Sequence, residues 1–242
     1  MPSCLPLDRV APTRRPSAKP SGVQRWSELL FVHWTFSPEL VRPLVPPELE
    51  LDLWDGRAWV GVVPFRMENV RPSWMPFSMD FLETNVRTYV HRRGEPGIFF
   101  FSLEASSWLA VKAARIGWGL PYFHAEMATT RDQDHVRYTS RRRATGARFE
   151  ADYTLGELLG PSPVDTLEHF LLERYLLFSV KNGVVSRGHV HHPPYSAQRA
   201  TLGELHEDLL VAAGLPRSED APASVHFASS VDVEVFGPWP EV

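Results

Sequence analysis

The sequence is poor in cysteine and lysine, and both shortages restrict its chemistry. Cys4 is the only cysteine among 242 residues, which excludes an intramolecular disulfide framework and a zinc site built on cysteines. The 25 basic residues divide into 3 lysines and 22 arginines. Arginine binds anions but is a poor base or amine nucleophile, because it stays protonated. A lysine mechanism is therefore restricted to Lys19, Lys112 or Lys181.

Features of several other protein classes are also absent. No apolar run reaches the roughly 18 residues of a membrane helix, and a net charge of −4 gives no basic excess for nucleic acid. The first twenty residues lack the apolar segment of a signal peptide. There is no glycine-rich phosphate loop and no nucleophile elbow. We therefore expect a cytoplasmic enzyme or binding protein without membrane or nucleic-acid partners.

Two parts of the chain differ in composition. Residues 1–22 mix prolines, Arg14, Arg15 and Lys19 with little apolar content, so this stretch cannot bury a core and is predicted to be a flexible tail. The remainder, residues 23–242, contains no linker. It is predicted to be a single domain.

Strand patterns dominate that domain. Hairpin turns are predicted at Asp55-Gly56, around Arg93-Gly94 and at Asn182-Gly183. Strands are expected over 29–36, 49–54, 58–67, 81–91, 98–103, 122–130, 136–143, 147–153, 174–180, 184–190 and 225–236, with a loop over 155–163. Helices are expected over 38–44, 106–118, 164–172 and 201–213. The pattern predicts an α+β fold, a large and mainly antiparallel sheet or barrel with a few peripheral helices.

The strand over 81–90 has two contrasting faces, because side chains alternate across a strand. One face is suited to a core and carries Leu82, Thr84, Val86, Thr88 and Val90. The other face carries Phe81, Glu83, Asn85, Arg87 and Tyr89. This polar face suits either the solvent-exposed side of an open sheet or the lumen of a barrel that binds a polar ligand.

Several segments together resemble a bacterial family, the domain of unknown function DUF2071, also called YqjF-like. They are His33-Trp34, residues 55–65, Val70-Arg71, residues 81–90, residues 97–103, Leu120-Pro121-Tyr122 and Glu173-Arg174-Tyr175. The resemblance implies a fold like that of acetoacetate decarboxylase, a β-cone or barrel around a buried polar cavity. It therefore favours the lumen interpretation of the polar strand face.

The same resemblance has consequences for individual residues. Acetoacetate decarboxylase forms a Schiff base through a lysine in a Gly-x-Pro-Lys segment that follows an arginine-containing helix. The similar segment here runs from Arg115 to Gly119-Leu120-Pro121-Tyr122, so Tyr122 stands where that lysine would be. Tyrosine cannot form an imine, and we expect no Schiff-base chemistry. Glu83 corresponds to a cavity glutamate of the decarboxylase.

Two hypotheses for function follow. The first is an enzyme, a lyase, isomerase or hydratase, for a small anionic or carbonyl compound. Glu83 would be its acid/base and Tyr122 a hydrogen-bond donor. The ligand-binding residues would be Asn85, Arg87, Tyr89, Arg115 and Arg174. The second hypothesis is a binding protein in which the same residues hold a ligand without turnover. A purely structural glutamate–arginine network and a homo-oligomer also remain open. No cofactor is expected.

Histidines and Lys112 offer weaker alternatives. His189 and His191 share one strand face, as do His124 and Glu126, which would suit a zinc site, but no supporting motif accompanies them and we predict no metal. His191 or His192 is a second candidate acid/base, because histidine titrates near neutrality. Lys112 lies within a predicted helix, where a solvated side chain is expected.

Overall fold

The computed structural model describes residues 7–181 and 183–241, and its strands account for most of them. The strands are β1 (Gly22–Phe36), β2 (Glu50–Leu51), β3 (Ala58–Pro72), β4 (Met79–Arg92), β5 (Glu95–Ala105), β6 (Tyr122–Asp132), β7 (His135–Arg142), β8 (Arg148–Gly160), β9 (Leu176–Lys181), β10 (Val184–His191), β11 (Ala197–Glu207) and β12 (Ser224–Glu241). The helices are α1 (Pro38–Val41), α2 (Trp108–Gly117), α3 (Leu167–Leu172) and α4 (Leu209–Ala212), with short 3₁₀ turns η1 (Ala11–Thr13) and η2 (Arg42–Leu44).

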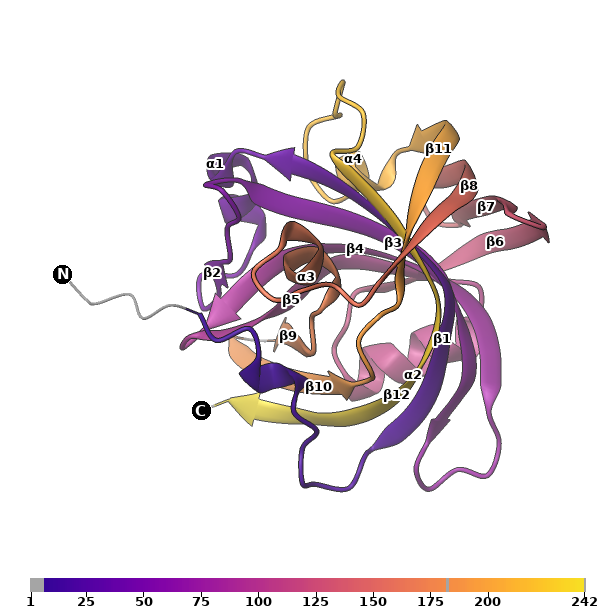
Figure 1. The fold of residues 1–242 in the computed structure, drawn as a ribbon. Helices are drawn as coiled ribbons and strands as arrows, with labels where there is room; N and C mark the ends of the chain where they lie inside the picture. The colour runs from indigo at the N-terminus through magenta and orange to yellow at the C-terminus, as the bar shows by residue number, and fades with distance from the viewer. Residues whose placement is uncertain (1–6, 182, 242) are drawn as a thin grey trace.

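Within the described residues the strands form one sheet that closes on itself. The sheet order is β10-β9-β5-β6-β7-β8-β11-β12-β1-β3-β4-β2, and β10 also pairs with β12 while β5 also pairs with β4. These extra pairings close a ring through β5, β4, β3, β1, β12, β10 and β9. Figure 1 shows this curved wall with α3 inside its outline and α2 beside it. The fold is α+β and barrel-like, as the sequence predicts.

Two hydrophobic cores lie on opposite faces of the shared strands. The first contains inward residues of the ring together with Phe170, Leu171 and Leu172 of α3. The second lies between β1, β3 and β4 on one side and β7 and β8 on the other. One face of β4 packs in the first core and the other face packs in the second. Every residue of β4 from Phe81 through Val90 is therefore buried.

Most predicted elements are present, but the helix over 201–213 is wrong. Residues 197–207 form β11, which pairs with β8 and β12, and only Leu209–Ala212 is helical. Leu and Glu favour helices locally, but the pairing of residues 200–207 with β8 outweighs that preference. The predicted loop over 155–163 is wrong for the same reason, since β8 continues to Gly160.

The Asp55-Gly56 turn is present, with positive φ at both residues, but β2 and β3 on either side of it do not pair with each other. The ladder at that turn is a single bridge between Trp54 and Arg57. β2 pairs with β4 instead. The turn therefore redirects the chain into β3 without forming the predicted hairpin.

The described part of the predicted tail has contacts with the domain. The Arg9 guanidinium forms an ion pair with Asp52, and Arg15 pairs with Glu234 at 2.5 Å. Ser21 donates its backbone N–H to the carbonyl of Val235. Cys4 and Asn182 lie outside the described residues. In the part of the chain that is described, no helix is both long and apolar enough to cross a bilayer.

Candidate active site in the first core

Glu83 and Tyr122 form a hydrogen-bonded pair in the first core. The phenol of Tyr122 donates to Oε2 of Glu83 over 2.7 Å, and only 3 % of Glu83 and 7 % of Tyr122 are exposed. Burial raises the pKa of Glu83 to about 7, although hydrogen bonds from Tyr122 and Asn85 act in the opposite direction. The pair is therefore a carboxyl group that titrates near neutrality beside a neutral phenol.

Strand pairing and helix α2 bring Tyr122 to this position. β6 begins beside β5 in parallel, which places Tyr122 opposite Leu103. Gly119 has a φ of +64°, a conformation that glycine adopts without strain and that turns the chain out of α2. Arg115 of α2 donates from Nε to the carbonyl of Tyr122 over 2.6 Å. Arg115 is itself an exposed residue, so the structure places it behind the Tyr122 backbone.

Arg87 lies on the same face of β4 and is 7 % exposed. One terminal nitrogen donates to the carbonyl of Leu171 over 3.0 Å. The guanidinium carbon lies 5.5 Å from the ring centre of Phe31 and 5.8 Å from that of Tyr89. Nε is buried without a partner, and no described carboxylate forms an ion pair with this side chain. Arg87 is thus a buried cation whose partners are a carbonyl, the Tyr89 hydroxyl and ring faces.

Tyr89 links Arg87 to His33. The Tyr89 hydroxyl donates to the carbonyl of Leu171 over 2.8 Å and lies 2.7 Å from Nε2 of His33. Because the phenol proton points to Leu171, we assign the proton of neutral His33 to Nε2. Burial lowers the pKa of His33 well below its ordinary value, and the charge of Arg87 adds to this effect. Nδ1 of His33 is then an acceptor, and it has no partner.

Arg174 has a different environment from Arg87. Its guanidinium donates to Asp52 over 2.7 Å and to the carbonyl of Phe170 over 2.7 Å. It also lies 4.9 Å from the ring centre of Tyr89. Arg174 therefore has the carboxylate of Asp52 as its anion, which it shares with Arg9, and Arg87 is the predicted ligand-binding arginine that is buried and lacks an anion.

A second carboxyl–phenol pair was missed by sequence reasoning. The hydroxyl of Tyr175 donates to Glu173 over 2.6 Å, and the backbone N–H of Tyr195 donates to the same carboxyl over 2.9 Å. Burial raises the pKa of Glu173. Glu173 and Tyr175 flank Arg174 in the connection between α3 and β9, and this spacing was the available signal.

The ring of His192 stacks on the ring of Tyr175, and the two ring centres lie 4.5 Å apart. Burial lowers the pKa of His192 to about 4, so its ring is neutral at pH 7. Burial lowers the pKa of His189 to about 4 as well. Neither ring titrates near neutrality, which is the property that made His192 a candidate acid/base.

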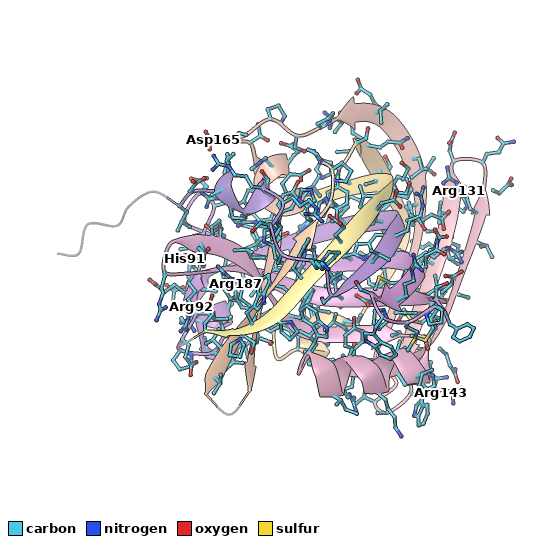
Figure 2. The ribbon with its side chains drawn as sticks, turned by 90° about the horizontal axis from the view of Figure 1, so that it is seen from below. His91, Arg92, Arg131, Arg143, Asp165 and Arg187 are labelled. Carbon is cyan, nitrogen blue, oxygen red and sulfur yellow. The ribbon has the colours of Figure 1, made fainter. Side chains whose placement is uncertain are left out.

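Glu126 and Lys112, which were considered for zinc binding and as a lysine nucleophile, are exposed residues. Glu126 pairs with exposed Arg143 over 3.1 Å, and Figure 2 shows Arg143 at the periphery of the molecule. Among the described residues no group of three or more potential ligands converges. Lys112 is exposed, and its ammonium group lies 4.0 Å from the ring centre of Trp108.

Two hollows in the surface are lined by other residues. One, of about 570 Å³, is bordered by His191, His192, Arg25 and Arg71 among others. The other, of about 330 Å³, adjoins η1 and includes His189. Neither lining includes Glu83, Arg87 or Tyr122, which are buried residues.

Comparison with known families matches residues 23–232 to the model of DUF2071, described as an uncharacterized conserved protein. The protein YqjF of Bacillus subtilis (strain 168), described as uncharacterized, is 36 % identical over 229 residues, which span 91 % of this chain and 93 % of YqjF. The family resemblance predicted from the sequence is therefore confirmed.

Solved structures with a similar fold share little sequence with this chain. Acetoacetate decarboxylase from Legionella pneumophila aligns with a TM-score of 0.62 at 18 % identity, over 95 % of this chain and 90 % of that one. The enduracididine biosynthesis enzyme MppR complexed with pyruvate aligns with a TM-score of 0.61 at 14 % identity, over 94 % and 93 %. An acetoacetate decarboxylase-like enzyme from Sphingomonas wittichii RW1 aligns with a TM-score of 0.62 at 13 % identity, over 93 % and 94 %. These likenesses confirm the predicted fold.

Proposed function

This chain belongs to the DUF2071 family, and from that premise we propose that it is an acid–base enzyme for a small carbonyl compound, acting without a lysine imine. The observation that carries the proposal is the buried Glu83–Tyr122 pair, with its 2.7 Å hydrogen bond and a carboxyl pKa of about 7. Perturbed carboxyl groups of this kind are enriched at catalytic sites. A general base works best when its pKa lies near the operating pH.

The proposed first step is removal of a proton from the carbon next to the carbonyl. The Glu83 carboxylate takes this proton, and the electron pair of the C–H bond moves through the new C=C bond to the carbonyl oxygen. Tyr122 then donates its hydrogen bond to the developing enolate, in place of the bond it donates to Glu83 in the structure. Return of the proton at another position, or loss of a leaving group, would give isomerase, lyase or hydratase chemistry.

The described lysines support a mechanism without an imine. Lys19 and Lys112 are both exposed, and Tyr122 stands where the resemblance to acetoacetate decarboxylase would place the Schiff-base lysine. One solved neighbour is an enzyme complexed with pyruvate, which supports a small oxo acid as the substrate class. Borohydride treatment in the presence of pyruvate is expected to give no covalent adduct.

Exchange of carbon-bound protons in D₂O tests the proposal. The wild-type protein should catalyse loss of the α-proton NMR signals of pyruvate or levulinate. Glu83→Gln should abolish the exchange, and Tyr122→Phe should slow it by about 10²- to 10³-fold, as expected for loss of an oxyanion donor. Glu104→Gln is the control, since Glu104 is a buried carboxyl bonded to Arg142. An exchange rate that Glu83→Gln leaves unchanged, or no exchange by the wild type, would overturn the proposal.

A second candidate is a binding protein that holds the same class of ligand without turnover. The unpartnered polar atoms on β4, Nε of Arg87 and Oδ1 of Asn85, favour a bound ligand but require no chemistry. In this case Glu83→Gln would change only the affinity for the ligand, and no proton exchange would occur at saturating ligand.

A further inference from the structure

We propose that Arg87 binds a carboxylate, so that the substrate is an oxo acid lying along β4 with its carboxylate at Arg87 and its carbonyl at Glu83 and Tyr122. This inference rests on the proposed function, because it specifies the substrate class of the same site. Its evidence is separate, because it comes from the contacts around Arg87, a residue that takes no part in the proposed acid–base step.

The environment of Arg87 lacks the anion that a buried guanidinium requires. Removing a charge from water is costly unless an opposite charge or sufficient hydrogen bonds replace the water. The other two buried arginines follow this rule, since Arg174 pairs with Asp52 and Arg142 pairs with Glu104. Arg87 has the carbonyl of Leu171 and the hydroxyl of Tyr89 as neutral partners, and its Nε–H is buried without an acceptor. A ligand anion would supply the missing partner.

The groups around Arg87 leave this role to a ligand. His33 is neutral because burial and the charge of Arg87 lower its pKa, and the pKa of His192 is lowered by burial and, to a smaller extent, by Arg87. Tyr89 is a neutral phenol whose pKa burial raises. None of these neighbours carries a negative charge, although the Tyr89 hydroxyl also interacts with the Arg87 guanidinium.

Asn85 lies between the two ends of the proposed ligand. Glu83, Asn85 and Arg87 occupy alternate positions of β4, so they share one face and span about 13 Å at roughly 3.3 Å per residue. Oδ1 of Asn85 is buried without a donor, although its amide interacts with Glu83. Two unpartnered polar atoms therefore follow one another on the face that also carries the acid/base.

A carboxylate fits this row better than a phosphate group. The planar guanidinium matches a carboxylate through two parallel N–H bonds, and the unpartnered Nε–H of Arg87 suits a single negative charge. Phosphate sites in proteins commonly combine several backbone N–H groups or several cations. The length of the row also favours an acid longer than pyruvate, with its carbonyl separated from its carboxylate.

Binding measurements with levulinate and its methyl ester test the carboxylate directly. Both compounds carry the same ketone, but only levulinate is an anion. We expect calorimetry to detect levulinate binding to the wild-type protein, at least 10-fold weaker binding of the ester, and at least 10-fold weaker binding of levulinate to Arg87→Gln. Arg143→Gln is the control for loss of an exposed arginine. Glu83→Gln should retain levulinate binding, because the carboxylate lies at the other end of the row.

The outcomes separate this inference from the proposed function. Retained levulinate binding without Glu83-dependent exchange would support the carboxylate site and overturn the acid–base enzyme. Glu83-dependent exchange with equal affinity for acid and ester would overturn only the carboxylate site. Binding of inorganic phosphate as tightly as levulinate, or no binding of any carboxylate, would also overturn it. If Arg87→Gln fails to fold, Arg87→Lys retains the charge without the fork and should still weaken levulinate binding.

Discussion

The raised pKa of Glu83 results from burial of its carboxyl group more than from the charges of its neighbours. Desolvation is the largest cause of its raised pKa, and the hydrogen bond from Tyr122 only partly opposes it. A buried carboxyl in such a site costs stability once it ionises. The residue that makes the proposed chemistry feasible therefore also weakens the fold at higher pH, which is a common compromise at functional sites.

The stability of the wild-type protein relative to Glu83→Gln should fall as the pH rises from about 4.5 to about 7. In this window the native Glu83 keeps a proton that the unfolded chain has released, because its pKa rises from 4.5 to about 7. The native state binds more protons, so stability decreases with pH. The difference amounts to roughly 3 kcal/mol at most. Urea unfolding of both proteins across the window measures it.

Opposing effects of histidine cancel in that comparison. Burial lowers the pKa values of His189 and His192 from 6.5 to about 4. The unfolded chain therefore binds protons more readily at these two residues, and their contribution to stability is lost as the pH falls below 6.5. Both proteins share these histidines. A constant difference between wild type and Glu83→Gln from pH 4.5 to 7 would contradict a raised Glu83 pKa.

Replacement by methionine should destabilise the protein much less at Arg87 than at Arg142. Arg87→Met removes a buried charge that has no internal anion, so the ligand-free protein should lose no more than about 1 kcal/mol, the value of its hydrogen bond. Arg142→Met leaves Glu104 buried without its partner and should cost about 3–5 kcal/mol. Chemical denaturation compares the two variants. Equal losses would show that Arg87 has a structural role instead of a binding role.

At the scale of elements, β4 shows why the sequence could predict which residues share the polar face of a strand but not whether that face is buried. The alternation separates Glu83, Asn85 and Arg87 from the apolar face, as the sequence predicts. Both faces are nevertheless buried, because one faces the first core and the other faces the second. Alternation alone cannot distinguish a solvent-exposed face from a polar face inside a closed sheet.

The close approach of β5 and β9 can be tested at Gly97. A Cβ atom at this position would lie 2.7 Å from the carbonyl oxygen of Leu176 and 2.8 Å from the ring of Phe178. Gly97→Ala should therefore destabilise the protein by about 1–3 kcal/mol through overpacking. Gly203→Ala is the control, since its nearest neighbour is 3.5 Å away, and it should be neutral or slightly stabilising. A thermal unfolding midpoint unchanged by Gly97→Ala would contradict the observed packing.

At the scale of the whole molecule, the N-terminal segment contributes a charge to the interior. Asp52 is shared between Arg9 of that segment and Arg174 beside α3. Figure 1 shows the segment with η1 close to β10 before the chain turns into β1, and the Arg9 guanidinium lies 5.4 Å from the ring centre of Phe170. Asp52 therefore links the N-terminal segment, through Arg9, to the segment after α3, through Arg174.

Substitutions in this charge triad should have graded effects. Arg9→Ala leaves Asp52 paired with Arg174 and should cost about 1–2 kcal/mol, whereas Asp52→Asn leaves two guanidinium groups without an anion and should cost about 3–5 kcal/mol. Arg15→Ala breaks an exposed pair with Glu234 and should have the smallest effect of the three. Unfolding free energies measure the order. Equal effects of Arg9→Ala and Asp52→Asn would show that the triad does not act as described.

Much of the candidate site could be predicted from the sequence because strand alternation is local. It placed Glu83, Asn85, Arg87 and Tyr89 on one face, and the family resemblance added Tyr122. It did not distinguish the environments of Arg87, Arg115 and Arg174, because an ion pair such as Arg174–Asp52 joins residues 122 positions apart. The role of each of these residues in binding or catalysis stays a prediction until the experiments above are done.

The sequence by itself determined the α+β class, the family and the absence of an amine at the decarboxylase's lysine position, because composition, alternation and motif identity are properties of neighbouring residues. Only the tertiary structure decided that the sheet closes, that Glu83 bonds Tyr122, and that Arg87 is buried without an internal anion. Closure depends on pairings between distant strands, such as β10 with β12. Burial and charge pairing, which set the pKa of Glu83, exist only once those strands have met.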